Sequence, residues 1–155
     1  MSSIFINRRR ALRTLACLGS VVAAVGAMRP LLAANWNKKA FEAMKVEEAI
    51  RGAGIINAQL SDQININAPE IAENGAQVPM DATSMIPDTE RIFIFSDKNV
   101  QPYVANFAIS KFVDPFISTR IKMGESSNVR VYVLAGGKYY YALREVKVTI
   151  GGCGS

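Results

Sequence analysis

Residues 129–143 read VRVYVLAGGKYYYAL, and this stretch decides the fold class. Valine recurs at every second position up to Val133, which is the spacing of a strand with one buried face. Gly136 and Gly137 follow, and a glycine pair favours the two-residue turn of a β-hairpin. The returning strand opens with apolar residues at alternate positions, Tyr139, Tyr141 and Leu143. The stretch therefore predicts an antiparallel hairpin near the carboxyl end.

The returning strand continues toward the end of the chain. Val146, Val148 and Ile150 again alternate, but in the other phase. A change of phase near Arg144 and Glu145 suggests a β-bulge, in which one extra residue is inserted into a strand.

Period-two alternation also fills the middle of the chain. It predicts five further strands, at residues 63–67, 77–83, 91–96, 103–109 and 117–123. Pro69 and Pro79 are expected to flank a loop at Glu70–Gln77. About seven short strands separated by turn residues predict a mainly β fold, an immunoglobulin-like antiparallel β-sandwich.

An N-terminal helix is expected before the strands. Trp36, Ala40, Phe41, Met44, Ala49 and Ile50 recur at helical spacing. Asn35 or Asn37 is a suitable N-cap, and Gly52 and Gly54 are suitable terminators. The apolar stripe is read as packing against the rest of the domain.

The first 34 residues are predicted to be a removable export signal. Asn7–Arg13 resembles the twin-arginine motif, with the pair Arg8-Arg9, although Asn7 and Ala11 depart from the usual pattern. A mildly apolar run, 14–28, follows and is shorter than the about 20 residues that span a bilayer. Cleavage is expected after Ala33 or Ala34. This leaves one domain at 35–150, with the expected helix and β-sandwich, and a tail at 151–155, and it predicts a periplasmic protein.

Removal of the signal changes the charge argument. The signal holds five of the 18 basic residues and no acidic residue, so 13 basic residues remain against 13 acidic ones. A nearly neutral domain gives no indication of a nucleic-acid or membrane partner. Cys17 is also removed, so Cys153 is the one cysteine left in the mature chain. A sandwich stapled by an internal disulfide is therefore excluded.

The chain contains no histidine. This absence excludes a histidine base, a histidine-assisted nucleophile and the common imidazole metal sites. One cysteine alone cannot form a zinc or iron–sulfur site. We therefore expect no catalytic residue, no metal and no cofactor in the chain itself.

The tail carries the distinctive chemistry. Cys153 lies between Gly152 and Gly154, with Gly151 before them and Ser155 at the end. Glycine adds no bulk and permits almost any backbone conformation, so the tail is predicted to be a thin, flexible arm. Only the thiolate of a cysteine attacks, and an unperturbed thiol has a pKa of about 8.5. The pattern favours a nucleophile that is activated in the pocket of a partner protein.

Two stretches of the sequence resemble the SoxY family, the substrate-carrier subunits of the periplasmic sulfur-oxidising system. One is the tail from Gly151 to Gly154, and the other is APEIAENG at residues 68–75, followed by Val78 and Pro79. The resemblance covers essentially the whole mature chain. It departs at Ser155, where the family usually has a second glycine.

The resemblance implies a function for the tail. Cys153 would carry thiosulfate-derived sulfur covalently, and Gly151, Gly152 and Gly154 would supply reach. The implied partners are a SoxZ-like small β subunit, a thiosulfate-loading c-type cytochrome enzyme, a sulfate-releasing hydrolase and a sulfane dehydrogenase. The chain itself would not be an enzyme.

Other interpretations remain open from the residues alone. Cys153 would serve equally well as a tether, joined by a disulfide to a partner or a second copy. A plain binding module with an incidental thiol is a further alternative. Phe93, Phe95 and the tyrosines at 139–141 are candidates for a partner interface. The core of the sandwich is an equally good place for them.

Overall fold

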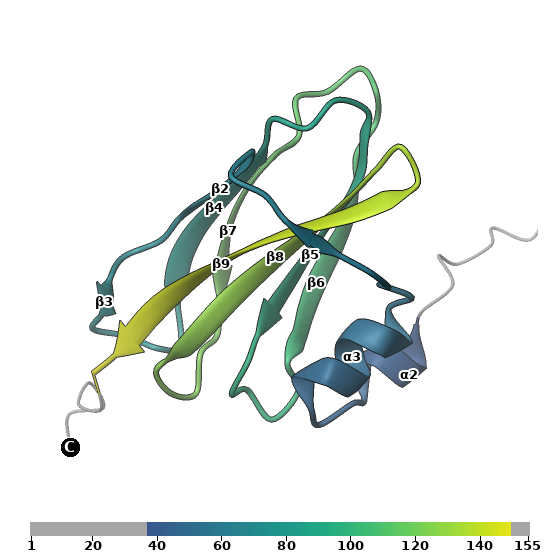
Figure 1. Cartoon of the computed structure of the whole chain (residues 1–155). Coiled ribbons are helices and arrows are strands. Elements are labelled where there is room, and N and C mark those ends of the chain that lie inside the picture. The colour runs from purple at the N-terminus through teal and green to yellow at the C-terminus, as the bar shows by residue number, and fades with distance from the viewer. Residues whose placement is uncertain (1–36, 150–155) are drawn as a thin grey trace, which may run out of the picture. The chain divides into compact units, whose positions relative to one another are not determined.

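The alternating stretches fold into two stacked β-sheets. The computed structural model describes residues 37–149, and these belong to the second of two units of the chain, Asn37–Ser155, which follows Met1–Trp36. The larger sheet has the order β1-β9-β8-β5-β6, with β3 also paired to β9. The smaller sheet has the order β2-β4-β7 (Figure 1). A mainly β, immunoglobulin-like sandwich is therefore confirmed.

All seven strands that the sequence predicts are present, with small shifts at their ends. Their bounds are β2 Ile64–Asn67, β4 Val78–Ser84, β5 Thr89–Ser96, β6 Tyr103–Ala108, β7 Phe116–Ile121, β8 Ser127–Ala135 and β9 Lys138–Val148. The described residues also form two short strands that alternation does not reveal, β1 Gln59–Leu60 and β3 Ile71–Ala72. Both run parallel to β9, whereas the other pairings are antiparallel.

The main core lies between the two sheets. The smaller sheet supplies buried residues from alternate positions of β2 and β4, such as Ile64 and Met80. The larger sheet supplies Ile92 and Ile94 from β5 and the alternating valines of β8, and all of these are fully buried. Period-two alternation therefore works as expected, because one face of each strand meets the opposite sheet.

A second core covers the outer face of the larger sheet. Phe93, Phe95 and Tyr132 point away from the first core and are buried against the helices. Tyr103 stacks between Phe95 and Phe41, at ring centroid separations of 4.8 and 4.1 Å. Tyr139 and Tyr141 are half-buried and pack on the same cluster. These aromatic side chains therefore pack within the domain. A place in the core is the second of the two interpretations that the sequence left open for them.

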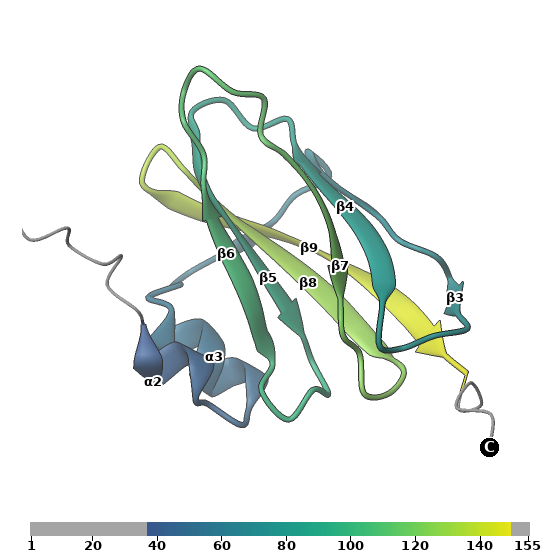
Figure 2. The same cartoon turned by 180° about the vertical axis from the view of Figure 1, so that it is seen from behind.

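The helical segment differs from the single helix expected. It forms α2 Lys38–Phe41 and α3 Val46–Gly52, beside the ends of β5 and β6 (Figures 1 and 2). Asn37 is the N-cap, and its side chain also donates to the carbonyl of Gly52 at 2.7 Å. A Cβ on Gly52 would lie 3.0 Å from the Cα of Ala40. Because Gly52 has no side chain, α3 can pack this closely against α2. One straight helix would keep these two residues apart.

The hairpin of β8 and β9 is confirmed, but the bulge is wrong. Gly136 and Gly137 have φ values of 55° and 73°, the left-handed region that this turn requires. Pairing of the two strands is continuous from Ala135 opposite Lys138 to Ser127 opposite Val146. The apolar phase changes because β9 serves two cores. Its tyrosines at 139 and 141 face the helices, whereas Val146 and Val148 face the smaller sheet.

The expectation of a loop between Pro69 and Pro79 is corrected. Pro79 is the second residue of β4, inside the strand that the alternation at 77–83 predicts. It is tolerated there because β2 has already ended, at Asn67 opposite Asp81, so that only β7 pairs beside Pro79. The expected loop at Glu70–Gln77 contains β3, which pairs with the end of β9.

Candidate functional site

The predicted site residues lie outside the described part of the chain. Cys153 and the glycines at 151, 152 and 154 follow Thr149, the last residue that the structure describes. The structure does describe the strand that leads to them. We call residues Lys147–Thr149, which directly precede the tail, the arm root. The hydrogen bonds of the arm root hold the end of β9 in the sheet, directly before the tail.

One side of the arm root is bound by β3. The backbone N–H of Lys147 donates to the carbonyl of Glu70 at 2.9 Å, and that of Thr149 donates to the carbonyl of Ala72 at 3.1 Å. These bonds alternate as in a short parallel ladder, with Ile71 opposite Lys147. The stretch 68–75 therefore has a definite structural role, since it supplies the strand that pairs with the arm root.

The other side of the arm root is bound by a serine side chain. Strand β8 begins at Ser127, opposite Val146, so that Val148 has no partner residue in β8. The N–H of Val148 donates instead to Oγ of Ser126 at 2.8 Å. The Ser126 hydroxyl donates in turn to the carbonyl of Val148 at 3.3 Å. Ser126 thus continues the hydrogen bonding of the sheet beyond the end of β8.

Gly75 closes the contact between the loops that hold the arm root. Its carbonyl accepts from the N–H of Met123 at 2.7 Å. A Cβ at position 75 would lie 2.5 Å from the carbonyl oxygen of Met123 and 2.7 Å from Cγ1 of Val148. Only glycine fits this close approach without a shift of the backbone.

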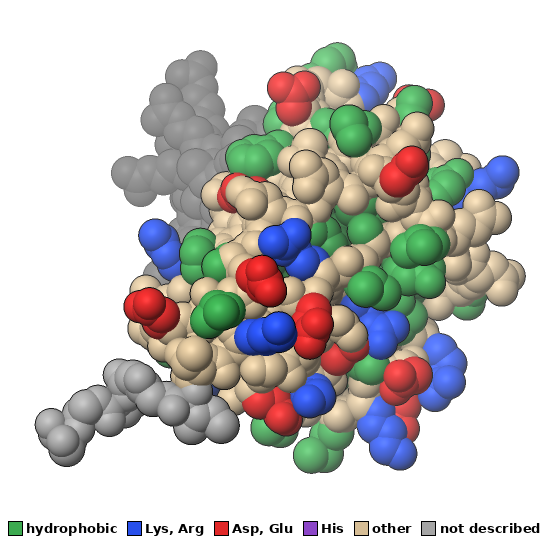
Figure 3. All heavy atoms as spheres, turned by 60° about the vertical axis from the view of Figure 1, so that its left-hand side comes forward, with side chains coloured by type: hydrophobic (Ala, Val, Ile, Leu, Met, Phe, Trp, Pro, Cys, Tyr) green, Lys and Arg blue, Asp and Glu red, His purple; other side chains and the backbone are tan. Residues whose placement is uncertain are grey.

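Three ion pairs lie near this end of the sandwich. Arg130 donates to Asp97 through two nitrogens, at 2.7 and 2.8 Å. This hydrogen bonding raises the pKa of Arg130, against the opposing effect of partial burial. Lys98 pairs with Glu125 at 3.7 Å and Lys147 with Glu70 at 3.9 Å, both on the surface. Figure 3 shows acidic and basic side chains interspersed over one face, with hydrophobic side chains between them.

A small pocket adjoins Ser126. It has a volume of about 150 Å³, and its lining is polar: Asp97, Lys98, Ser126, Ser127, Asn128 and Glu145. Asp97 is already bound to Arg130. The hydroxyl of Ser126 is engaged with Val148 and that of Ser127 lies 3.4 Å from the hydroxyl of Ser96, so the serines of this pocket are used in structure.

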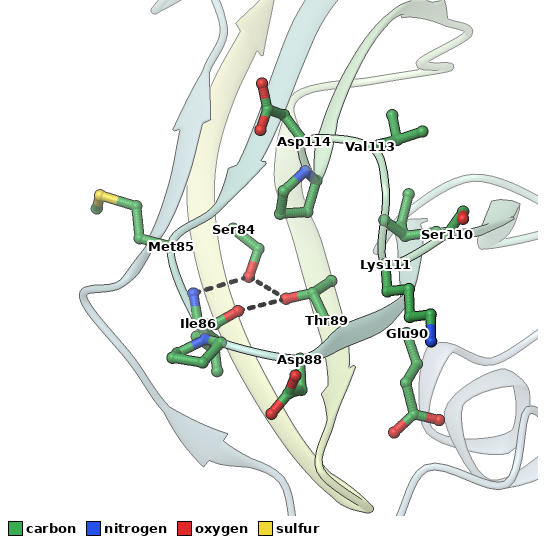
Figure 4. A pocket seen from close by; sticks show the side chains of 13 residues that line it. Ser84, Met85, Ile86, Asp88, Thr89, Glu90, Ser110, Lys111, Val113 and Asp114 are labelled. Atoms are coloured by element: carbon green, nitrogen blue, oxygen red, sulfur yellow. Dashed lines mark hydrogen bonds between the residues drawn. The ribbon is translucent and has the colours of Figure 1, made fainter.

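A larger pocket, of about 490 Å³, lies between the β4–β5 and β6–β7 loops. These loops are at the opposite end of the sandwich from the end of β9 (Figure 1). Thr89 donates to the carbonyl of Ile86 at 2.8 Å, and its Oγ1 lies 2.8 Å from Oγ of Ser84 (Figure 4). These hydroxyl groups stabilise the turn, so they are engaged in structure rather than aimed at a ligand.

Metal and membrane motifs were also sought in the described residues, 37–149. No three acidic, cysteine or histidine side chains there are grouped so as to hold a metal ion. No helix in that range is long and apolar enough to cross a membrane. Burial raises the pKa of both Tyr103 and Tyr132, so these phenols remain protonated at neutral pH.

Sequence reasoning missed Ser126. Its partner, Val148, is 22 positions away in the sequence. No sequence motif predicts a hydrogen bond between a serine side chain and a backbone group that is so distant. The stretch 68–75 carries part of the family resemblance, and the sequence predicts a loop at residues 70–77, where the structure has β3. The adjacent apolar residues Ile71 and Ala72 were the available signal for a strand.

Comparison with known proteins agrees with this geometry. A family model described as "Sulfur oxidation protein SoxY" matches residues 51–153. A solved structure of the sulfur carrier protein SoxY from Chlorobium limicola f thiosulfatophilum is 46% identical, with a TM-score of 0.63. That match covers 68% of this chain and 97% of that one. A search of the curated proteins finds no match.

A second solved structure shares the fold alone. It is a superoxide reductase (neelaredoxin) from Ignicoccus hospitalis, with 14% identity and a TM-score of 0.51, over 56% of this chain and 80% of that one. Together, the sandwich and the matched sequence define a sulfur carrier protein of the immunoglobulin-like class. The chain belongs to the SoxY family of sulfur oxidation proteins.

Proposed function

We propose that the chain carries thiosulfate-derived sulfur as a covalent adduct on Cys153 and presents it to partner enzymes. Membership of the sulfur carrier family is the observation that carries this proposal. Two features support it. Cys153 is the one thiol left in the predicted mature chain, and it lies four residues beyond Thr149, which is hydrogen-bonded to β3.

The proposed loading step is an oxidation. The thiol of Cys153 loses its proton, and its sulfur forms a bond to the outer sulfur of thiosulfate. Two electrons leave in this step, and a c-type cytochrome enzyme accepts them. The product is a thiosulfonate on Cys153.

The proposed release step is a hydrolysis. Water attacks the terminal sulfonate, the sulfur–sulfur bond to it breaks, and sulfate leaves together with a proton. A persulfide remains on Cys153 and passes to a sulfane dehydrogenase for further oxidation. A hydrolase supplies the catalysis, because the chain lacks histidine, the residue most often used as a general base.

The proposal includes a place and a complex. The twin-arginine motif at Arg8-Arg9 supports export to the periplasm. A SoxZ-like small β subunit is the proposed partner in a heterodimer. Gly151, Gly152 and Gly154 let the cysteine enter narrow pockets, because they carry no side chains.

Intact mass spectrometry tests the proposal. The mature protein is purified gently from cells grown on thiosulfate and weighed before and after treatment with a reductant. We expect added mass equal to a thiosulfonate or to extra sulfur atoms, lost on reduction and absent in Cys153→Ser. A bare thiol under every growth condition would contradict the proposal. A disulfide-linked dimer alone would favour a tether instead.

A further inference from the structure

The arm root is bound on both of its edges, up to the last residue that the structure describes. Each of its three backbone N–H groups donates to a neighbour: Lys147 to Glu70 and Thr149 to Ala72 on one side, and Val148 to Ser126 on the other. Chain ends commonly fray because their backbone groups bond to water. Here the pairing persists up to Thr149.

The two edges are secured by different parts of the chain. On one edge, β3 is followed by Gly75, whose carbonyl binds the N–H of Met123. On the other edge, Ser126 follows Met123 by three residues and reaches Val148 through its side chain alone. The loop that contains Met123 is also held by Asn99, which donates to the carbonyl of Lys122 and accepts from Gly124. The contacts therefore form one closed network around the arm root.

From this network we propose that Ser126 and β3 position the cysteine, by fixing at Thr149 the point from which the tail extends. This inference rests on the proposed carrier function. Ser126 is a positioning residue, since it acts on the backbone of Val148 and not on the sulfur. Its role is to keep residues 147–149 paired within the sheet.

The anchor sets the reach of the thiol. Cys153 is four residues beyond Thr149, which allows about 13–14 Å at full extension. If the arm root detached, the next firm point would be Val146, which is fully buried. The reach would then be about 23–25 Å over seven residues. An anchored tail therefore suits partners whose reacting atom lies within about 14 Å of the docked carrier surface.

The anchor also limits the volume that the thiol explores. The local concentration of a tethered group falls roughly as the −3/2 power of tether length once the tether spans the gap. Extending the tether from four residues to seven would lower that concentration about twofold. A fixed root thus favours entry of the cysteine into a pocket of matching depth.

Hydrogen exchange measured by NMR tests the anchor residue by residue. In Ser126→Ala, we expect the protection of the Val148 amide to fall about tenfold, because its acceptor is lost. The amide of Val131, in the middle of β8, should keep its protection. Ser126→Thr retains a hydroxyl and should restore protection to within about threefold of wild type. Ser110→Ala, which removes an exposed loop hydroxyl bound to Phe112, is the matched control.

A spin-label distance gives a readout that a change in stability alone would not move. One label is attached to Cys153 and one to Lys138→Cys, at the far end of β9, about 36 Å from the arm root along the strand. We expect the distance distribution to broaden in Ser126→Ala. It should broaden further in Ser126→Ala with Lys147→Pro, which also removes the donor to Glu70.

The outcomes separate the two proposals. Reduced Val148 protection, rescue by threonine and a broader distribution would support the anchor. Unchanged Val148 protection and an unchanged distribution, in both the single and the double variant, would overturn it. Neither measurement depends on bound sulfur. Failure of the carrier proposal would appear separately, as a wild-type protein that never gains mass on Cys153.

Discussion

Gly75 packs closely against Met123 and Val148 beside the arm root, and this packing requires that position 75 has no side chain. We expect Gly75→Ala to destabilise the domain by about 1–3 kcal/mol, because the added methyl group would overlap the carbonyl of Met123 and the side chain of Val148. Gly124→Ala is the control, since its Cβ would meet only Oδ1 of Asn99, at 3.9 Å. Urea unfolding of both variants measures the difference. Equal midpoints for the two would contradict the close packing described here.

The titration of Tyr103 is expected to make the free energy of unfolding depend on pH in the alkaline range. Burial raises its pKa above the ordinary value of 10.0, whereas hydrogen bonding from Asn106 and the charge of Arg91 lower it. The folded state therefore holds this proton more tightly than the unfolded chain. Its contribution to stability is fully present below pH 10 and is lost as the pH rises through the folded pKa.

The variant Tyr103→Phe isolates this effect. It keeps the ring between Phe41 and Phe95 but removes the titrating hydroxyl. We expect it to lose about 1 kcal/mol at neutral pH, because Asn106 loses its acceptor. Its free energy of unfolding should then fall less steeply than that of wild type above pH 10. Parallel pH profiles from urea titrations would show that Tyr103 does not titrate differently in the two states.

The strands were predictable wherever alternation alone decides burial. The valines of β8 alternate because one face meets the smaller sheet, and the glycine pair after them fixes the turn. The short strands β1 and β3 were not predictable in this way. Each has only two residues, and each forms by pairing with β9, far along the sequence.

The helical cover explains two other departures from the sequence reading. Helices α2 and α3 bury the outer faces of β5 and β8, so Phe93 and Phe95 are core residues although they alternate with Ile92 and Ile94. The same cover reverses the apolar phase along β9, which sequence analysis took for a bulge. A pattern of period two shows that a strand has a buried face, but not that both faces are buried.

The sequence by itself predicts the chemistry of the candidate site, because a lone thiol among glycines is visible there. It does not predict the contacts that hold the arm root, because Ser126 and Glu70 reach it across 22 and 77 positions of sequence respectively. Such contacts depend on how the two sheets bring loops together.

On the proposed function, the whole molecule divides into the folded sandwich and the sulfur atom that would carry the adducts. Several different adducts would then form on Cys153 while the hydrogen bonds of the arm root hold the end of β9 in the sandwich. We therefore expect alkylation of Cys153 with iodoacetamide to change the free energy of unfolding by less than about 0.5 kcal/mol, which is the usual range for a change that disturbs no packed contact. Urea unfolding of the mature protein, alkylated and free, measures this, with Cys153→Ser as the unreactive control. A shift of more than about 1 kcal/mol would mean that the tail packs on the sandwich. The thiol would then have to leave a docked position before it could enter the pocket of a partner.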